Sequence, residues 1–212
     1  MSLELSDTNM QQKPENGRKV LLILAVIFLL PFTVAAVLHL LQFHPGGHSY
    51  GNLINPPKAL QFPVLHDVQG KPFGADQWDK KWSIVTIGTE SCNDDCQKLL
   101  HLQQQVHISL GKERDRVQRV LLIPAEVDKG AVLDMQNRYP NLIILTGADA
   151  ETARFVSMFD LPRRAAGEDQ RTYLVDPMGN LMMSYSQKES GGLDPKGLRK
   201  DITRLLKNSW AG

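Results

Sequence analysis

The segment Trp82–Leu102 most constrains the fold, because a buried strand, two cysteines and a helix follow one another within it. Residues 84–87 form an apolar, β-branched run that Gly88 bounds, and such a run predicts a buried strand. The spacing of apolar residues from Cys96 onward predicts a helix. Cys92 and Cys96, the two cysteines of the chain, are therefore expected at a strand-to-helix turn.

This position gives the thiols a specific chemistry. The N–H groups and the positive end of the helix dipole stabilise a thiolate at Cys92, which lowers its expected pKa below the free-thiol value of about 8.5. Cys96 is one turn further along the same helix face, with Cα atoms roughly 6 Å apart, as a disulfide requires. We expect a pair that opens and closes without moving the fold. A structural disulfide is the alternative, although so short a loop removes little chain entropy.

Two carboxylates, Asp94 and Asp95, lie between the cysteines. They oppose formation of a neighbouring thiolate but favour a bound cation. They also suit the first turn of a helix, where negative side chains interact favourably with the dipole. Both roles remain open from the sequence.

An apolar segment near the N-terminus predicts a membrane helix. Residues 20–41 contain no Asp, Glu, Lys or Arg and reach the roughly 20 residues that cross a hydrocarbon core. Arg18 and Lys19 precede this segment and no Lys or Arg follows until Lys58, so the positive-inside rule places the domain outside the cytoplasm. We expect a retained anchor and not a cleaved signal peptide, because the run is long and no Ala-x-Ala site follows.

The chain of 212 residues is expected to divide into four parts. These are a polar cytoplasmic tail (1–19), a transmembrane helix (20–41), a Gly/Pro/Asn-rich linker (42–59) and a globular domain (60–212). The linker contains His44 and His48, a pair that could bind a metal but lacks fixed geometry in a loop. With 24 basic and 23 acidic residues, the net charge of +1 offers no argument for nucleic acid as a partner.

Within the domain, strands alternate with helices. The patterns predict a hairpin over 60–73, strands at 84–87, 117–124, 142–145, 172–175 and 181–185, and helices at 96–110, 130–139, 150–159 and 195–207. This order predicts an α/β fold, with a mixed sheet covered by helices on both faces. The order is thioredoxin-like, with the thiols where such folds carry them.

Over residues 60–207 the sequence resembles the Sco/SenC family of membrane-tethered, thioredoxin-fold proteins. Gly88 stands four residues before the first thiol, the C-x3-C pair has Asp94 at its centre, and a Y-L-V-D-P-x-G turn spans 173–179. The segment YLVDPMGNLMM, followed by D-P-K-G at 194–197, is similar to the single-span Sco-like proteins of proteobacteria.

The resemblance implies a protein of the bacterial inner membrane that assists cytochrome c oxidase biogenesis, with its domain in the periplasm. Its partners would be oxidase subunits or assembly factors, and membrane lipid through one helix. Cys92 and Cys96 would bind copper(I), with Asp94 beside them. Alternatively, the same cysteines would be catalytic residues of a thiol-disulfide reductase that acts on the oxidase's copper-ligand cysteines. A non-catalytic accessory role is a third possibility, so the resemblance leaves enzymatic activity open.

Two departures from the family pattern bear on metal binding. Asn93 stands where Sco proteins usually have Pro after the first cysteine. The family supplies a third copper ligand, a histidine, a few residues before the late turn, whereas residues 167–172 read GEDQRT. Arg171 would repel a cation if it faced the thiols.

Other candidate ligands are weaker. His101 and His107 belong to the predicted cysteine helix, but His101 is turned away from the face that carries Cys96. Met182 and Met183 have soft sulfurs that suit Cu(I), although methionine in a strand more often fills the core. The sequence therefore predicts a site of two thiolates, which suits Cu(I) better than Cu(II).

Overall fold

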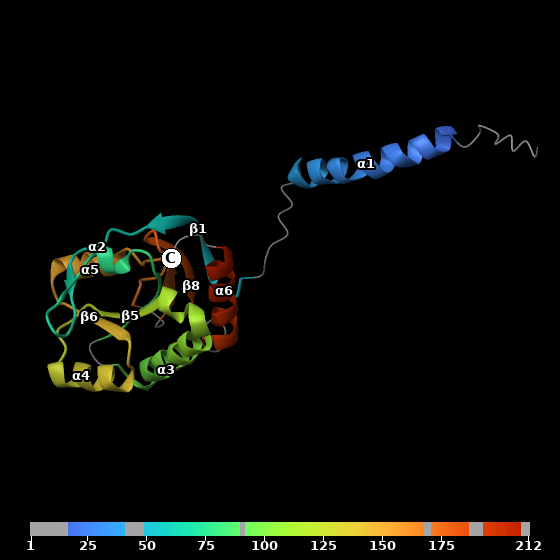
Figure 1. Ribbon diagram of the computed structural model, residues 1–212. Coiled ribbons are helices and arrows are strands. Elements are labelled where there is room, and N and C mark those ends of the chain that lie inside the picture. Colours follow the sequence, from blue (N-terminus) through green and yellow to red (C-terminus); the bar gives the residue numbers. More distant parts are fainter. Residues whose placement is uncertain (1–16, 41–48, 90–91, 168–170, 187–192, 209–212) are drawn as a thin grey trace, which may run out of the picture. The chain divides into compact units, whose positions relative to one another are not determined.

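Figure 1 shows the computed structural model of the chain, which describes residues 17–40, 49–89, 92–167, 171–186 and 193–208. The chain forms two compact units, Met1–His48 and Ser49–Gly212. The first contains helix α1 (Gly17–Leu40), of which Gly17–Leu38 is long and apolar enough to cross a membrane. The prediction of one apolar N-terminal helix is confirmed. His44 and His48 lie outside the described residues.

The second unit is built on a six-stranded mixed sheet with the strand order β1-β8-β7-β4-β5-β6. The strands are β1 (Asn52–Ala59), β4 (Trp82–Ile87), β5 (Val117–Ile123), β6 (Leu142–Thr146), β7 (Thr172–Val175) and β8 (Asn180–Tyr185). Strands β4, β5 and β6 are parallel to one another. Strand β7 is antiparallel to β4, β8 is antiparallel to β7, and β1 is antiparallel to β8. Strands β2 (Leu65–His66) and β3 (Pro72–Phe73) form the predicted hairpin around a left-handed Gly70.

Helices cover both faces of this sheet (Figure 1). Helices α3 (Asp94–Ser109), α4 (Lys129–Arg138) and α6 (Pro195–Asn208) pack on one face, and α2 (Ala75–Trp78) and α5 (Ala150–Ser157) pack on the other. A 3-10 helix, η2 (Gly111–Arg116), joins α3 to β5.

Successive residues of β5 pack in different apolar clusters, one on each face of the sheet. Leu121 and Ile123 pack in the cluster that includes residues of α3 and α4, whereas Val120 and Leu122 pack in the aromatic cluster around Phe155. This alternation follows because successive side chains of a strand point to opposite faces. The predicted α/β class, with a thioredoxin-like mixed sheet between two helical layers, is confirmed.

One expected loop is a strand. Asn52–Ala59 forms the edge strand β1, although the sequence predicted a linker as far as residue 59. Pairing with β8 joins Leu53 to Met183 and resumes at Lys58, so Pro56 and Pro57 fall in the irregular stretch between. Proline is tolerated there because an edge strand has one side without ladder hydrogen bonds. The Pro- and Asn-rich composition of this segment predicted a loop, but pairing with β8 stabilises it as a strand.

The start of this domain is tied to α6 by a buried carboxylate. Asp201 accepts hydrogen bonds from the N–H groups of Tyr50 and Gly51, at 2.9 and 3.0 Å, and from the hydroxyl of Tyr185 at 3.1 Å. Burial, together with the charge of Asp201, holds the pKa of Tyr185 well above its usual range. These contacts attach the first residues of the unit to its last helix.

Candidate functional site

The two cysteines lie just after the carboxyl end of β4 and are joined by a disulfide, with their Cα atoms 5.2 Å apart. Their environments differ. Cys96 is only 3% exposed and packs in the cluster that contains Leu100 and Leu121, whereas Cys92 is half-buried. Cys92 is therefore the more accessible of the two.

Asn93 caps the helix that follows Cys92. Its side-chain oxygen accepts a hydrogen bond from the N–H of Cys96 at 3.0 Å, which satisfies one of the free donors of the first turn. Asp94 and Asp95 are exposed in that turn, and Asp95 pairs with Lys98 at 3.1 Å. Asn93, which stands where Sco proteins usually have proline, thus has a structural role as the N-cap of α3.

Further along α3, Gln103 fastens the helix to the sheet. Its buried amide nitrogen donates to the hydroxyl oxygens of Thr86 on β4 and Thr172 on β7, at 2.7 and 2.8 Å. Because these bonds are sheltered from water, they hold α3 in a defined position over two strands. The cysteine turn is therefore supported on a fixed helix.

A cavity of about 360 Å³ lies beside Cys92, lined chiefly by α4 and the residues that flank it, with Gln97 from α3. The lining residues include Cys92, Gln97, Asp134, Met135, Arg138 and Tyr139. It therefore brings Cys92 together with Met135 and with charged residues of α4.

Gln97 connects the disulfide turn to α4. Its amide nitrogen donates to the carbonyl oxygen of Cys92 at 3.3 Å, and its amide oxygen accepts from Arg138 at 2.6 Å. The hydroxyl of Tyr139 donates to the Gln97 carbonyl oxygen at 2.9 Å. Sequence reasoning missed these residues, because Arg138 and Tyr139 are about forty positions away and no local pattern points to the thiols.

The two histidines of α3 are not part of the dithiol site. His101 is exposed, and His107 is near the other end of the helix. The Nε2–H of His107 donates to the carbonyl oxygens of Arg114 and Val117, at 3.0 and 2.8 Å. Burial, and then the nearby charge of Arg119, lowers the pKa of His107, although these two hydrogen bonds oppose the change.

The late methionines fill space beneath α6. Met183 is buried in the cluster of α3 and α6, and Met182 packs against that cluster. Arg171 is buried directly before β7. Residues 168–170, in the segment where the family pattern has its third ligand, lie outside the described residues. In the part of the chain that the structure describes, no three His, Cys, Asp or Glu side chains gather as a metal cluster.

Comparison with solved structures shows the same fold in Sco proteins. Yeast Sco1 with copper bound matches at a TM-score of 0.61 and 20% identity, over 73% of this chain and 96% of that one. Bradyrhizobium japonicum ScoI with copper bound matches at 0.55 and 21%, over 69% and 98%. BsSco, described as a Sco-family cytochrome c oxidase assembly protein with a disulfide switch, matches at 0.56 and 17%, over 74% and 99%.

These structural neighbours are Sco proteins, so the resemblance drawn from the sequence is confirmed at the level of the fold. A search of curated proteins found no match. A family model described as the transmembrane-like, thioredoxin-like, C-terminal domain matches residues 82–209, which is more than half of the chain. The chain therefore belongs to the family of transmembrane-like proteins with a thioredoxin-like C-terminal domain.

Proposed function

We propose that this protein is a membrane-anchored, Sco-like factor that assists cytochrome c oxidase biogenesis by holding copper(I) between Cys92 and Cys96. The observation that carries the proposal is the paired cysteine turn, in which an accessible sulfur is backed by a buried one and borders a cavity. The structural neighbours support it, because yeast Sco1 and Bradyrhizobium ScoI are described with copper bound and BsSco as an oxidase assembly protein.

The donor set of the cysteine turn fits a soft monovalent ion. Two electrons and two protons from a dithiol reductant convert the disulfide into two thiols, which release their protons when they bind metal. Cu(I) accepts two thiolate sulfurs, and the thioether of Met135 in the same cavity is another soft donor. Asp94 carries an exposed carboxylate in the adjacent helix turn, where it would add negative potential without binding the ion.

Anaerobic titration of the reduced full-length protein in detergent, against a competing Cu(I) chelator, tests this proposal. The wild type should retain one Cu(I), and either Cys92→Ser or Cys96→Ser should abolish retention. His101→Ala should have no effect. Met135→Leu should weaken retention, whereas Met158→Leu, a matched change on the opposite face of the sheet, should not. Equal copper uptake by the wild type and the double serine variant would exclude copper binding at these thiols.

The proposal places the domain in the periplasm, on the evidence of Arg18 and Lys19 at the N-terminal end of α1. Single cysteines introduced at Thr8 or Ser49 in a background without Cys92 and Cys96 distinguish the two orientations. An impermeant maleimide applied to intact spheroplasts should label position 49 and spare position 8. The reverse pattern would place the domain in the cytoplasm.

Thiol-disulfide reduction is the second candidate, and the difference in burial between the two cysteines favours it. The Cys92 thiolate would attack a partner disulfide, forming a mixed disulfide and expelling one partner thiolate. Cys96 would then attack the Cys92 sulfur, releasing the second partner thiolate and leaving the protein oxidised. Cys96→Ser should therefore trap a mixed disulfide with an oxidised peptide containing the oxidase's copper-ligand cysteines, and Cys92→Ser should not.

A further inference from the structure

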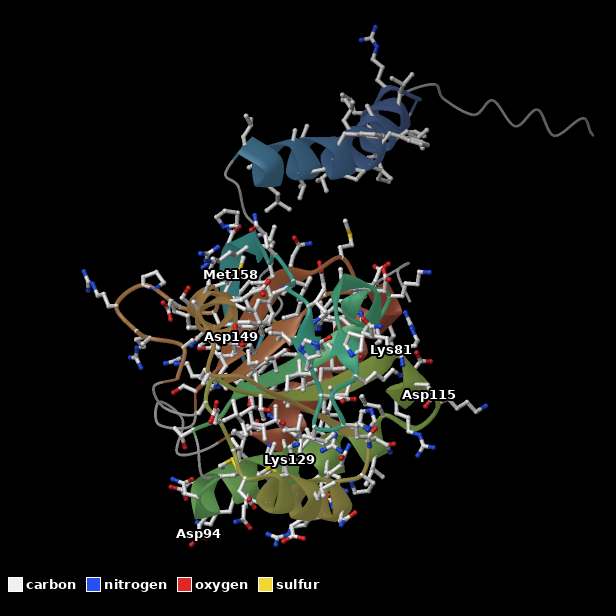
Figure 2. The ribbon with its side chains drawn as sticks, turned by 90° about the vertical axis from the view of Figure 1, so that its left-hand side faces the viewer. Lys81, Asp94, Asp115, Lys129, Asp149 and Met158 are labelled. Atoms are coloured by element: carbon white, nitrogen blue, oxygen red, sulfur yellow. A yellow bond between two sulfur atoms is a disulfide. The ribbon has the colours of Figure 1, made fainter. Side chains whose placement is uncertain are left out.

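A second cavity, of about 710 Å³, lies far from the disulfide, at the amino ends of the parallel strands. Trp82 pairs with Val117 at the first residues of β4 and β5, whereas Cys92 follows the carboxyl end of β4. Figure 2 shows Lys81 and Asp115, which line this cavity, on one side of the domain and Asp94, the first residue of α3, on the other. The two cavities are therefore separate sites.

Arg119 lines this cavity and carries a buried charge that no carboxylate of the described residues pairs with. It is 1% exposed, and its Nη2 donates to the carbonyl oxygen of Pro140 at 2.9 Å. Its Nε and Nη1 have no hydrogen-bond partner, and the ion pairs found among the described residues do not include it. Burial lowers the pKa of Arg119 to about 10, so the guanidinium is still charged at neutral pH.

A buried arginine with unpaired N–H donors and no counter-charge lowers the stability of the fold. A guanidinium has five N–H donors, and leaving buried donors unpaired costs their full desolvation. A buried charge that lacks a partner adds a larger penalty. A ligand that supplies negative charge and accepting oxygens would remove both costs.

The other charged groups around the cavity leave it net positive. Lys81 and Arg114 line it with Arg119, and Asp115 is the carboxylate among its lining residues. The Asp115 side chain is 89% exposed and is 3.7 Å from the Nε of Arg114. His107 also lines the cavity, and its lowered pKa keeps it neutral at neutral pH. A partly enclosed space with this balance concentrates anions.

The rest of the lining is apolar or uncharged. Ile108, Val117 and Ile143 contribute aliphatic surface, and Gln104 and Asn141 contribute amide groups. A bare inorganic anion would leave this aliphatic surface without a partner. A carboxylate attached to a small apolar group matches both parts of the lining.

We propose that this cavity binds an organic carboxylate, with Arg119 as the residue that pairs with the carboxylate group. Arginine suits this role because its N–H donors match carboxylate oxygens in geometry and charge. The apolar part of the ligand would lie against the aliphatic residues of α3, β5 and β6. The carboxylate belongs either to a free small molecule or to the C-terminus of a polypeptide.

Thermal unfolding of the full-length protein in detergent, with a matched pair of probes, tests the proposal. N-acetyl-leucine carries the carboxylate, and N-acetyl-leucinamide is the same molecule with a neutral amide. The acid should raise the Tm progressively with concentration, by several degrees at about 100 times its Kd, because it binds only the folded state. The amide should leave the Tm unchanged at equal ionic strength.

Variants assign the effect to Arg119. Arg119→Met keeps an unbranched, though shorter, side chain and removes the charge, so it should fold without the buried-charge penalty and lose the response to N-acetyl-leucine. Arg154→Met, a matched change at an exposed position of α5, should keep the full response. Cys92→Ser/Cys96→Ser should also keep it, which separates this site from the dithiol. Equal responses to acid and amide, or an unchanged response in Arg119→Met, would mean that only water solvates the guanidinium.

A spectroscopic readout covers the case in which Arg119→Met does not fold. In wild-type protein labelled with ¹⁵N, N-acetyl-leucine should shift the Nε–H resonance of one arginine in a saturable manner. Arg119→Lys should lack that resonance. If no arginine Nε–H signal moves, the proposal is wrong.

The source of the carboxylate follows from a third probe. The tripeptide Gly-Gly-Leu has the same terminal carboxylate on a longer chain. Binding at least tenfold tighter than that of N-acetyl-leucine would identify a polypeptide C-terminus as the ligand. Binding that is equal or weaker would identify a free small molecule.

Discussion

Two residues one helix turn apart have different surroundings at the cysteine turn. Cys96 belongs to a packed cluster beneath α3, whereas Cys92 borders a cavity that opens to solvent. The reactivity of a thiol depends on its access as well as on its thiolate fraction. If the protein acts as the thiol-disulfide reductase proposed above, the difference in burial predicts that Cys92 attacks the partner and that Cys96 resolves the mixed disulfide.

Alkylation of single-cysteine variants tests this assignment. Iodoacetamide should modify Cys92 readily in Cys96→Ser under native conditions, and should modify Cys96 in Cys92→Ser much more slowly. The same reaction in 6 M guanidinium should equalise the two rates. Equal rates in the folded proteins would contradict the assignment of roles.

His107 makes the domain's stability depend on pH. Burial lowers its pKa in the folded state below the ordinary value of 6.5, so between these two values the unfolded state binds more protons. Stability due to His107 is therefore complete above pH 6.5 and is lost as the pH falls toward the folded-state pKa. Because one proton is involved, the free energy of unfolding changes by at most about 1.4 kcal/mol per pH unit.

Chemical denaturation between pH 7.5 and pH 5 measures this slope. His107→Gln should reduce it, because glutamine keeps an N–H donor for the carbonyl oxygens but does not titrate. His101→Gln, at the exposed position on the same helix, should leave the slope unchanged. A steep slope that persists in His107→Gln would assign the effect to other groups.

At the scale of elements, helix α3 joins both ends of the domain. Its first turn contains Cys96 of the disulfide, and its middle is hydrogen-bonded to β4 and β7 through Gln103. Its last turn carries His107, which lines the cavity that contains Arg119. The helix start depends on one side chain, because Asn93 supplies the cap. The cap therefore affects both stability and the geometry of the thiols.

Asn93→Ala should lower the free energy of unfolding by about 0.5–2 kcal/mol, the usual cost of losing a helix N-cap. Asn93→Asp keeps an accepting oxygen at the same position and should recover most of that loss. Urea denaturation of the oxidised proteins measures both changes. A loss in Asn93→Asp as large as that in Asn93→Ala would show that capping is not the role of Asn93.

At the scale of the whole molecule, the disulfide contributes little to the fold. It closes a loop of four residues, for which the chain-entropy relation gives about 2 kcal/mol. The sheet, its two helical layers and the attachment of Tyr50 and Gly51 to Asp201 do not depend on it. We therefore expect the domain to stay folded when the disulfide is reduced.

Reduction should accordingly lower the Tm by roughly 4–8 °C without loss of the native fold. Far- and near-ultraviolet circular dichroism before and after treatment with a phosphine reductant, followed by thermal melts, checks this. Cys92→Ser/Cys96→Ser should match the reduced wild type. Loss of near-ultraviolet signal on reduction at 25 °C would instead make the disulfide structural.

Local patterns were sufficient to predict most of the fold. Strands β4 and β5, helix α3 and the β7-β8 hairpin were predicted from the sequence, because each has the periodicity or turn residues that its own backbone requires. The place of the two cysteines at a strand-to-helix turn follows from the same reasoning. Their disulfide spacing is a property of one helix turn, which is also local.

Contacts between distant segments decided the rest. Strand β1 exists because β8, more than a hundred residues later, pairs with it, and its own Pro- and Asn-rich composition predicts a loop. The contacts of Arg138 with Gln97 and the burial of Arg119 likewise depend on how α4 and α3 pack on the sheet. The burial and the partners of a side chain depend on neighbours from the whole chain. The tertiary structure alone therefore distinguishes the accessible cysteine from the buried one and reveals, among the described residues, an arginine without a counter-charge.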